Sequence, residues 1–136
     1  MRKVSELENL CGPAKPLRHE PADAQETENL IKSGQLRLRD AQNKSLALES
    51  RFDLAYNGAH ALSLAALRRL GYRATNRYIV FQVLPYTLGL GPEVWRVLSK
   101  CHDARNLSEY EGGMDINDRL VEDLIAATQK VAQMLS

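Results

Sequence analysis

The chain has 136 residues and a formal net charge of +1 at pH 7, from 18 lysines and arginines against 17 aspartates and glutamates. At roughly 100–200 residues per domain, this length predicts one domain, or one domain with a tail. A hydrophobic fraction of 44% and a charged fraction of 26% exclude a collagen, a disulfide scaffold and a wholly disordered chain. The near-neutral balance argues against a generic nucleic-acid coat but leaves room for a local basic patch.

Nothing in the sequence points to a membrane, a metal or another cofactor. The longest apolar stretch, Ala59–Leu67, is interrupted by His60 and Ser63, and it is far shorter than the roughly 20 residues that span a bilayer. Cys11 and Cys101 lie far apart, and the three histidines are too scattered to suggest a cluster of metal ligands. We therefore expect a cytoplasmic protein with reduced thiols and with neither a metal nor another cofactor.

Two segments are expected, an N-terminal arm over residues 1–21 and a helical domain over residues 22–136. Pro13, Pro16 and Pro21, together with Gly12, would break any long helix in the arm. The arm is expected to be a loosely held terminal segment, with a short helix near its start.

Apolar residues spaced three or four apart predict the helices of the domain. Ser50 is the expected N-cap of the most apolar helix, which Gly71 would end. Gly34 would allow a kink in the helix before it. The expected helices cover about residues 22–44, 50–70, 76–88 and 93–110, and a last one begins near Asp115 or Asn117.

The segment from residue 76 to 88 is the least clear of these. Its run from Tyr78 to Phe81 is β-branched or aromatic, which also suits a strand, but no partner strand is expected elsewhere. Pro85 should kink or end this helix. The predicted fold is therefore all-α, an antiparallel up-down four-helix bundle with an additional helical or irregular N-terminal arm.

The fourth predicted helix carries a polar face. His102, Arg105, Asn106 and Glu109 follow one another at helical spacing and would line one side. Such a face could bind phosphate through Arg105 and transfer protons through His102. The alternative is a solvated face on which Arg105 and Glu109 form an ordinary ion pair.

Each of the other notable histidine and arginine residues could have either a structural role or a role in binding. His60, in the most apolar helix, is expected to be a satisfied core residue. Arg51, near a helix N-terminus where the dipole disfavours a cation, should have a partner, either a carboxylate or a bound phosphate. The arginines between Arg68 and Arg77 form a basic cluster that could contact RNA or an acidic partner, or be a charged surface loop.

Three segments resemble a HEPN domain (higher eukaryotes and prokaryotes nucleotide-binding). They are Arg51–Leu62 (RFDLAYNGAHAL), Leu70–Tyr72 (LGY) and Ala104–Tyr110 (ARNLSEY), and the resemblance extends over residues 28–131. It implies an up-down helical bundle that dimerises. Many such domains are metal-independent ribonucleases, often toxins of toxin–antitoxin or phage-defence pairs, and others are inactive partners of a nucleotidyltransferase.

Active members of that family carry an arginine, then four to six residues, then a histidine. Arg105-Asn106 resembles the start of this motif, but Tyr110 stands where the histidine would be. A tyrosine, with an ordinary pKa of about 10, is a poor general base at neutral pH. Arg96 and His102 also satisfy the spacing, one to two turns earlier. Either Arg96 and His102 form an active pair, or the site binds a substrate without cleaving it.

The resemblance thus implies a homodimer that binds a nucleotide, RNA or a partner protein, the partner being an antitoxin or a nucleotidyltransferase. The alternatives are an active endoribonuclease toxin and a helical interaction module without a ligand. Arg105 and Asn106 would bind phosphate, and Tyr110 would stack or hydrogen-bond. The candidate catalytic residues are Arg96, His102 and Arg105, and the candidate binding residues are Arg51, Asn106, Glu109 and Tyr110.

Overall fold

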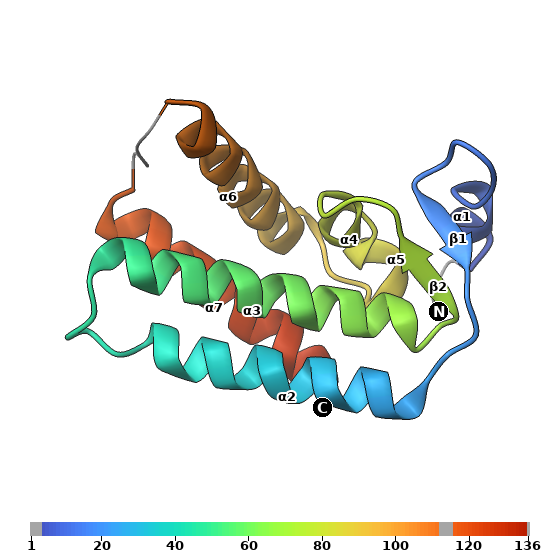
Figure 1. Ribbon diagram of the computed structural model, residues 1–136, viewed down its shortest axis with the longest axis horizontal. Coiled ribbons are helices and arrows are strands. Elements are labelled where there is room, and N and C mark those ends of the chain that lie inside the picture. The colour runs from blue at the N-terminus through green and yellow to red at the C-terminus, as the bar shows by residue number, and fades with distance from the viewer. Residues whose placement is uncertain (1–3, 112–115, 136) are drawn as a thin grey trace.

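The computed structural model describes the backbone of residues 4–111 and 116–135, and the side chains of residues 5–106 and 116–135. It is mostly helical, which confirms the predicted class (Figure 1). In chain order the elements are α1 (Val4–Asn9), β1 (Leu17–His19), α2 (Ala24–Ala41), α3 (Leu48–Arg68), β2 (Tyr72–Ala74), α4 (Ile79–Gln82), α5 (Leu84–Thr87), α6 (Pro92–Glu111) and α7 (Asp118–Leu135).

Three long helices, α2, α3 and α7, pack together, and α3 contacts both of the others. α2 and α3 run antiparallel, whereas α6 crosses above α3 at a steep angle and contacts chiefly α7 and α4 (Figure 1). Phe52, Leu62 and Leu67 on α3 are fully buried. A helix that is apolar over most of its circumference belongs at the centre of a helical core, as its composition predicted.

The contact between α2 and α3 depends on two glycines that face each other. A Cβ atom built on Gly34 would lie 2.5 Å from Cγ of Leu62 and 3.1 Å from the carbonyl oxygen of Gly58. A Cβ atom on Gly58 would lie 3.1 Å from the carbonyl oxygen of Gly34. Gly34 therefore lies inside a continuous α2 because the two backbones approach too closely for a side chain.

Two of the long helices begin at a side-chain cap, whereas α3 does not. Asp23 caps α2 by accepting hydrogen bonds from the backbone N–H groups of Gln25 and Glu26, and Asn117 caps α7 by accepting one from Leu120. The prediction that Ser50 caps the central helix is wrong, since α3 begins at Leu48 without a side-chain cap. Pro92 begins α6, as its fixed φ angle favours.

The single helix predicted over residues 76–88 is wrong. The segment forms two short helices, α4 and α5, with Val83 between them. Pro85 stands in the first turn of α5, where its missing N–H group costs no hydrogen bond, so it begins a helix here. The helical interpretation of Ile79–Gln82 is confirmed over the strand alternative.

The expectation of a loosely held N-terminal arm is also wrong. β1 pairs antiparallel with β2, with Leu17 opposite Ala74 and His19 opposite Tyr72. Leu7 and Leu17 are fully buried in the core. The arm thus contributes apolar side chains to the core, and with β2 it forms a two-stranded sheet that the predicted all-α fold does not contain.

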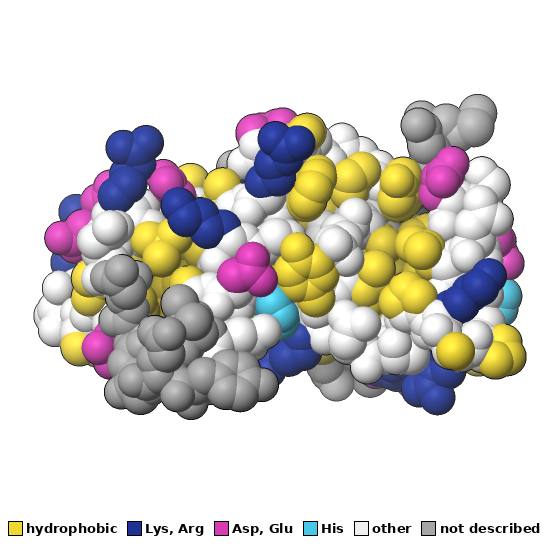
Figure 2. All heavy atoms as spheres, turned by 90° about the horizontal axis from the view of Figure 1, so that it is seen from above, with side chains coloured by type: hydrophobic (Ala, Val, Ile, Leu, Met, Phe, Trp, Pro, Cys, Tyr) yellow, Lys and Arg dark blue, Asp and Glu magenta, His cyan; other side chains and the backbone are white. Residues whose placement is uncertain are grey.

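Basic and acidic side chains are interspersed on the face of the molecule that Figure 2 shows. Seen from above, basic side chains lie at separate places, with acidic side chains near several of them (Figure 2). No helix in the described part of the chain is both long and apolar enough to cross a membrane.

Candidate functional site

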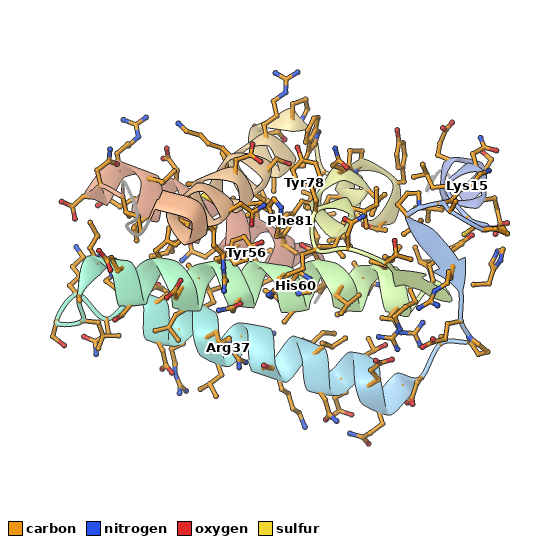
Figure 3. The ribbon with its side chains drawn as sticks, turned by 45° about the horizontal axis from the view of Figure 1, so that its top comes forward. Lys15, Arg37, Tyr56, His60, Tyr78 and Phe81 are labelled. Atoms are coloured by element: carbon orange, nitrogen blue, oxygen red, sulfur yellow. The ribbon has the colours of Figure 1, made fainter. Side chains whose placement is uncertain are left out.

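Polar and aromatic side chains from three elements meet where α6 crosses α3. They come from α3, from the loop after β2, and from the middle of α6. We call them the His102 cluster: Tyr56, Asn57, Arg77, Tyr78, His102, Arg105 and Asn106. Figure 3 shows Tyr56 on α3 pointing toward Tyr78 and Phe81 on the other side of this junction.

His102 is held on both ring nitrogens. Its Nδ1 atom lies 2.7 Å from the hydroxyl oxygen of Tyr56, and its Nε2 atom lies 3.0 Å from Nδ2 of Asn106. If the amide of Asn106 donates to Nε2, the imidazole proton resides on Nδ1 and is donated to Tyr56. The ring of Tyr78 packs edge-on against the imidazole, with centroids 5.0 Å apart. These contacts fix the plane of the imidazole ring.

Two arginines from different elements converge beside this histidine. Arg77 Nη2 and Arg105 Nη1 both donate to Oδ1 of Asn57, at 3.2 Å and 3.4 Å. Their guanidinium carbons lie 5.7 Å and 4.9 Å from the centroid of the Tyr56 ring. Arg77 forms no ion pair with any side chain that the structure describes. Two cations thus share a neutral acceptor and an aromatic face.

The positive field of the cluster reaches His60, one turn further along α3. Burial lowers the pKa of His60 to about 4, and the nearby charges of Arg77, His102 and Arg105 lower it in the same direction. His60 is therefore neutral at pH 7, and its ring packs edge-on against Phe81. The expectation of a purely core role is incomplete, because the side chain is only partly buried.

The structure brings together some of the predicted site residues. His102, Arg105 and Asn106 lie in one cluster, as their helical spacing predicted. Arg96 does not join them: it is exposed, and its guanidinium lies over the ring of Trp95. The side chains of Glu109 and Tyr110 lie outside the described residues, and so does the predicted ion pair between Arg105 and Glu109.

Arg51 has a partner of neither expected kind. Its Nε atom donates to the backbone carbonyl oxygen of Ala41 at 2.8 Å, and its side chain is buried. Ala41 is the last residue of α2, where the helix dipole places negative partial charge. The partner found is a backbone carbonyl, so Arg51 joins the end of α2 to the start of α3, and a contact between Arg51 and a phosphate stays a prediction.

The basic cluster between Arg68 and Arg77 divides between two roles. Arg68 is buried, and its Nε donates to Oε1 of Glu26 at 2.8 Å. Arg73 pairs with Glu20 and Glu26. The hydrogen bonds from Arg68 and Arg73 hold the pKa of Glu26 below its ordinary value. These two arginines join the arm to α2 and α3. Arg69 lines the pocket beside α2, and Arg77 alone of the four lies in the His102 cluster.

The sequence alone assigns no site role to three members of the cluster, Tyr56, Asn57 and Tyr78. Arg77 stands in the basic cluster for which contact with RNA is one of the two interpretations. Tyr56 and Asn57 lie inside the segment Arg51–Leu62 that carries the family resemblance, which was the available signal. Tyr56 and Asn57 contact α6 because α3 and α6, which are distant in the sequence, cross in the fold. No local sequence pattern predicts that crossing.

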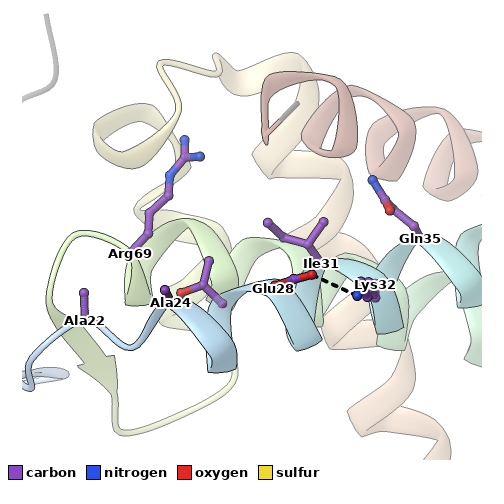
Figure 4. A pocket seen from close by; sticks show the side chains of 8 residues that line it. Ala22, Ala24, Glu28, Ile31, Lys32, Gln35 and Arg69 are labelled. Carbon is purple, nitrogen blue, oxygen red and sulfur yellow. Dashed lines mark ion pairs between the residues drawn. The ribbon is translucent and has the colours of Figure 1, made fainter.

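A larger pocket lies elsewhere, beside α2 and the end of α3 (Figure 4). Its volume is about 610 Å³, and its walls are mostly apolar, with an ion pair of 2.8 Å between Glu28 and Lys32 at one side. It contains no histidine and no cysteine. The concentration of polar chemistry therefore favours the His102 cluster as the candidate site.

Within the described residues, no group of three or more histidine, cysteine, aspartate or glutamate side chains is placed to hold a metal ion. Cys101 is buried, which raises the pKa of its thiol to about 12. Its thiolate is therefore scarce at neutral pH, and it is not a candidate nucleophile.

Comparison of the chain with protein-family models, with curated proteins and with solved structures finds no match. The case for a function therefore depends on the geometry of the cluster and on the residues that carry the family resemblance.

Proposed function

We propose that the His102 cluster binds the phosphate groups of a nucleotide or RNA, in a protein of HEPN-like type. The observation that carries this proposal is the convergence of Arg77 and Arg105 on Oδ1 of Asn57. Guanidinium groups match the geometry of phosphate oxygens and remain charged at every physiological pH. A phosphate group beside both arginines would offset the repulsion between them.

The surroundings of the two arginines support a single-stranded ligand. Tyr78 places a partly exposed aromatic ring beside His102 and next to Arg77 in the chain, and aromatic rings beside cations are the combination on which unpaired bases stack in single-strand binding proteins. Tyr56 is fully buried, so its ring supports the two arginines from below. The net charge of +1 is small, and on the face that Figure 2 shows, basic side chains lie apart and do not form the broad basic surface that tracks a long duplex. A short contact with a few phosphates fits this charge distribution.

The test is binding of a fluorescently labelled, short single-stranded RNA, followed by anisotropy at low salt. We expect Arg77→Ala and Arg105→Ala each to weaken binding about tenfold, since loss of a phosphate contact costs on the order of 1 kcal/mol. Arg96→Ala is the matched control, because Arg96 is an exposed arginine on the same helix but outside the cluster. The control should bind as the wild type does.

Two outcomes would contradict the proposal. Equal weakening by Arg96→Ala and Arg105→Ala would mean that the RNA is held by general charge and not by the cluster. Absence of binding by the wild-type protein to both RNA and free nucleotides would leave a helical interaction module without a phosphate ligand.

A second candidate function is that of a metal-independent endoribonuclease. It is favoured by the hydrogen bond between Tyr56 and Nδ1 of His102, which orients the imidazole beside Arg105. His102 would transfer a proton, and the arginines would stabilise the charge that develops on the phosphate. Cleavage of RNA in the presence of EDTA should then be abolished by His102→Ala, while RNA binding is largely kept. Intact RNA after incubation with the wild type would exclude this function.

The resemblance also leads us to propose a homodimer, with an antitoxin or a nucleotidyltransferase as the partner. Light scattering coupled to size-exclusion chromatography measures the mass of the particle directly. A mass of about twice 15.3 kDa would support the dimer, and a mass of about 15.3 kDa would contradict it.

A further inference from the structure

A small pocket adjoins the His102 cluster and shares Arg77 with it. Its volume is about 240 Å³. It lies between the outer face of α3 and the loop that follows β2. Its lining residues are His60, Leu64, Arg73, Ala74, Thr75, Asn76 and Arg77.

The walls of this pocket suit a flat heteroaromatic ring. Leu64 and Ala74 supply apolar surface, and the imidazole of His60 supplies a ring one turn along α3 from Tyr56 (Figure 3). His60 forms no hydrogen bond with any residue that the structure describes, so its two ring nitrogens can serve a ligand as donor and acceptor. Because it is neutral at pH 7, it adds hydrogen bonds without adding a third cation.

The charge and size of the pocket narrow the choice of ligand. Arg73 is neutralised by Glu20 and Glu26, which leaves Arg77 at the boundary with the cluster as the cation that can meet an anion. Pockets that enclose a complete small molecule have volumes of roughly 300–1,000 Å³. A pocket of about 240 Å³ has room for one ring system rather than for a whole nucleotide.

We propose that this pocket receives one unpaired base of a single-stranded RNA or nucleotide whose neighbouring phosphate is bound by Arg77 and Arg105. This inference rests on the proposed phosphate-binding function and names the substrate class of the same site. Arg77 lies in both parts, so a base in the pocket places the adjoining phosphate near the point where the two guanidinium groups converge.

The experiment compares a short single-stranded RNA with an abasic strand that has the same sugar–phosphate backbone. The wild type should bind the RNA about tenfold more tightly than the abasic strand, because stacking and hydrogen bonding of a base add to the phosphate contacts. Leu64→Trp, which fills the pocket, should remove this preference by weakening RNA binding and leaving the affinity for the abasic strand unchanged. His60→Ala, which removes the polar wall, should reduce the preference at least threefold.

The outcomes separate this inference from the proposed function. Equal binding of both strands by the wild type would overturn the base pocket and leave the phosphate site intact. A tenfold preference retained in His60→Ala and in folded Leu64→Trp would also overturn it, and circular dichroism and thermal melting check the fold of each variant. Absence of binding to either strand, or no effect of Arg105→Ala on either, would overturn the phosphate site and the base pocket together.

Discussion

The arginines of this chain differ in role because their partners differ. Arg68 is buried and donates to Glu26 and to backbone carbonyl groups, including those of Glu20 and Pro21, so it joins the arm to the helices. Arg77 is exposed and has a neutral partner in Asn57. A buried arginine with satisfied hydrogen bonds stabilises the fold, whereas an exposed one beside a second cation is available to an anion.

His60 makes the stability of the protein depend on pH. Its pKa is lowered from 6.5 to about 4 in the folded state, so between these values the unfolded chain binds a proton that the folded chain does not. The contribution of His60 to the free energy of unfolding is therefore fully present above pH 6.5, and this contribution is lost as the pH falls toward 4. We expect the free energy of unfolding to fall over this range by on the order of 2 kcal/mol from this histidine.

Urea unfolding at a series of pH values measures this effect. The matched variant is His60→Gln, which keeps a polar side chain but does not titrate. Its stability should change less than that of the wild type between pH 6.5 and 4.5, and the difference between the two isolates His60 from the carboxyl groups and from His19. Parallel curves for the two proteins would contradict the lowered pKa.

At the scale of elements, the contact between α2 and α3 is decided by its smallest residues. Gly34 and Gly58 allow the two backbones to approach, and Leu62 fills the space beside them. In an open helix, replacing glycine by alanine stabilises by about 0.5–1 kcal/mol. At Gly34 and Gly58 we expect alanine to destabilise the protein instead, because the added methyl group would meet Leu62 or a backbone oxygen.

We therefore expect Gly34→Ala and Gly58→Ala each to destabilise the protein by about 1–3 kcal/mol, as overpacking does. Gln35→Ala, at an exposed position next to Gly34 on α2, is the control and should change stability by less than about 0.5 kcal/mol. Chemical denaturation gives the three values. A stabilised Gly34→Ala variant would show that the two helices can separate at little cost.

At the scale of the whole molecule, the arm holds the loop that carries the site. β1 pairs with β2, and Thr75 just beyond β2 donates both its backbone N–H and its hydroxyl to the carbonyl oxygen of Pro16. Arg77 follows two residues later. The N-terminal segment thus positions one of the two arginines from a great distance along the chain.

Burial of Leu17 fixes this arm, so its truncation should be costly. We expect Leu17→Ala to destabilise the protein by about 2–5 kcal/mol, the range for a fully buried leucine. Leu36→Ala is the matched control, because Leu36 on α2 is 49% exposed and should cost far less. Thermal or urea unfolding compares the two variants. Equal and small effects would mean that the arm is only weakly docked.

Local signals in the sequence accounted for a large part of this fold. The apolar spacing of α3, the cap at Asn117 and the start of α6 at Pro92 each depend on residues within a few positions of one another. The pairing of the arm with β2 does not follow from such signals, because residues 17–19 and 72–74 are far apart in the sequence and the packing of α2 against α3 brings them together.

The candidate site divides in the same way. Helical spacing alone determined that His102, Arg105 and Asn106 share one face of α6, since the α-helix brings such positions together whatever surrounds it. Only the tertiary structure decided that this face meets Tyr56 and Arg77, and that Arg96 and Arg51 lie outside the cluster. The physical reason is that the crossing of α6 over α3 depends on packing throughout the core, which no short stretch of sequence encodes.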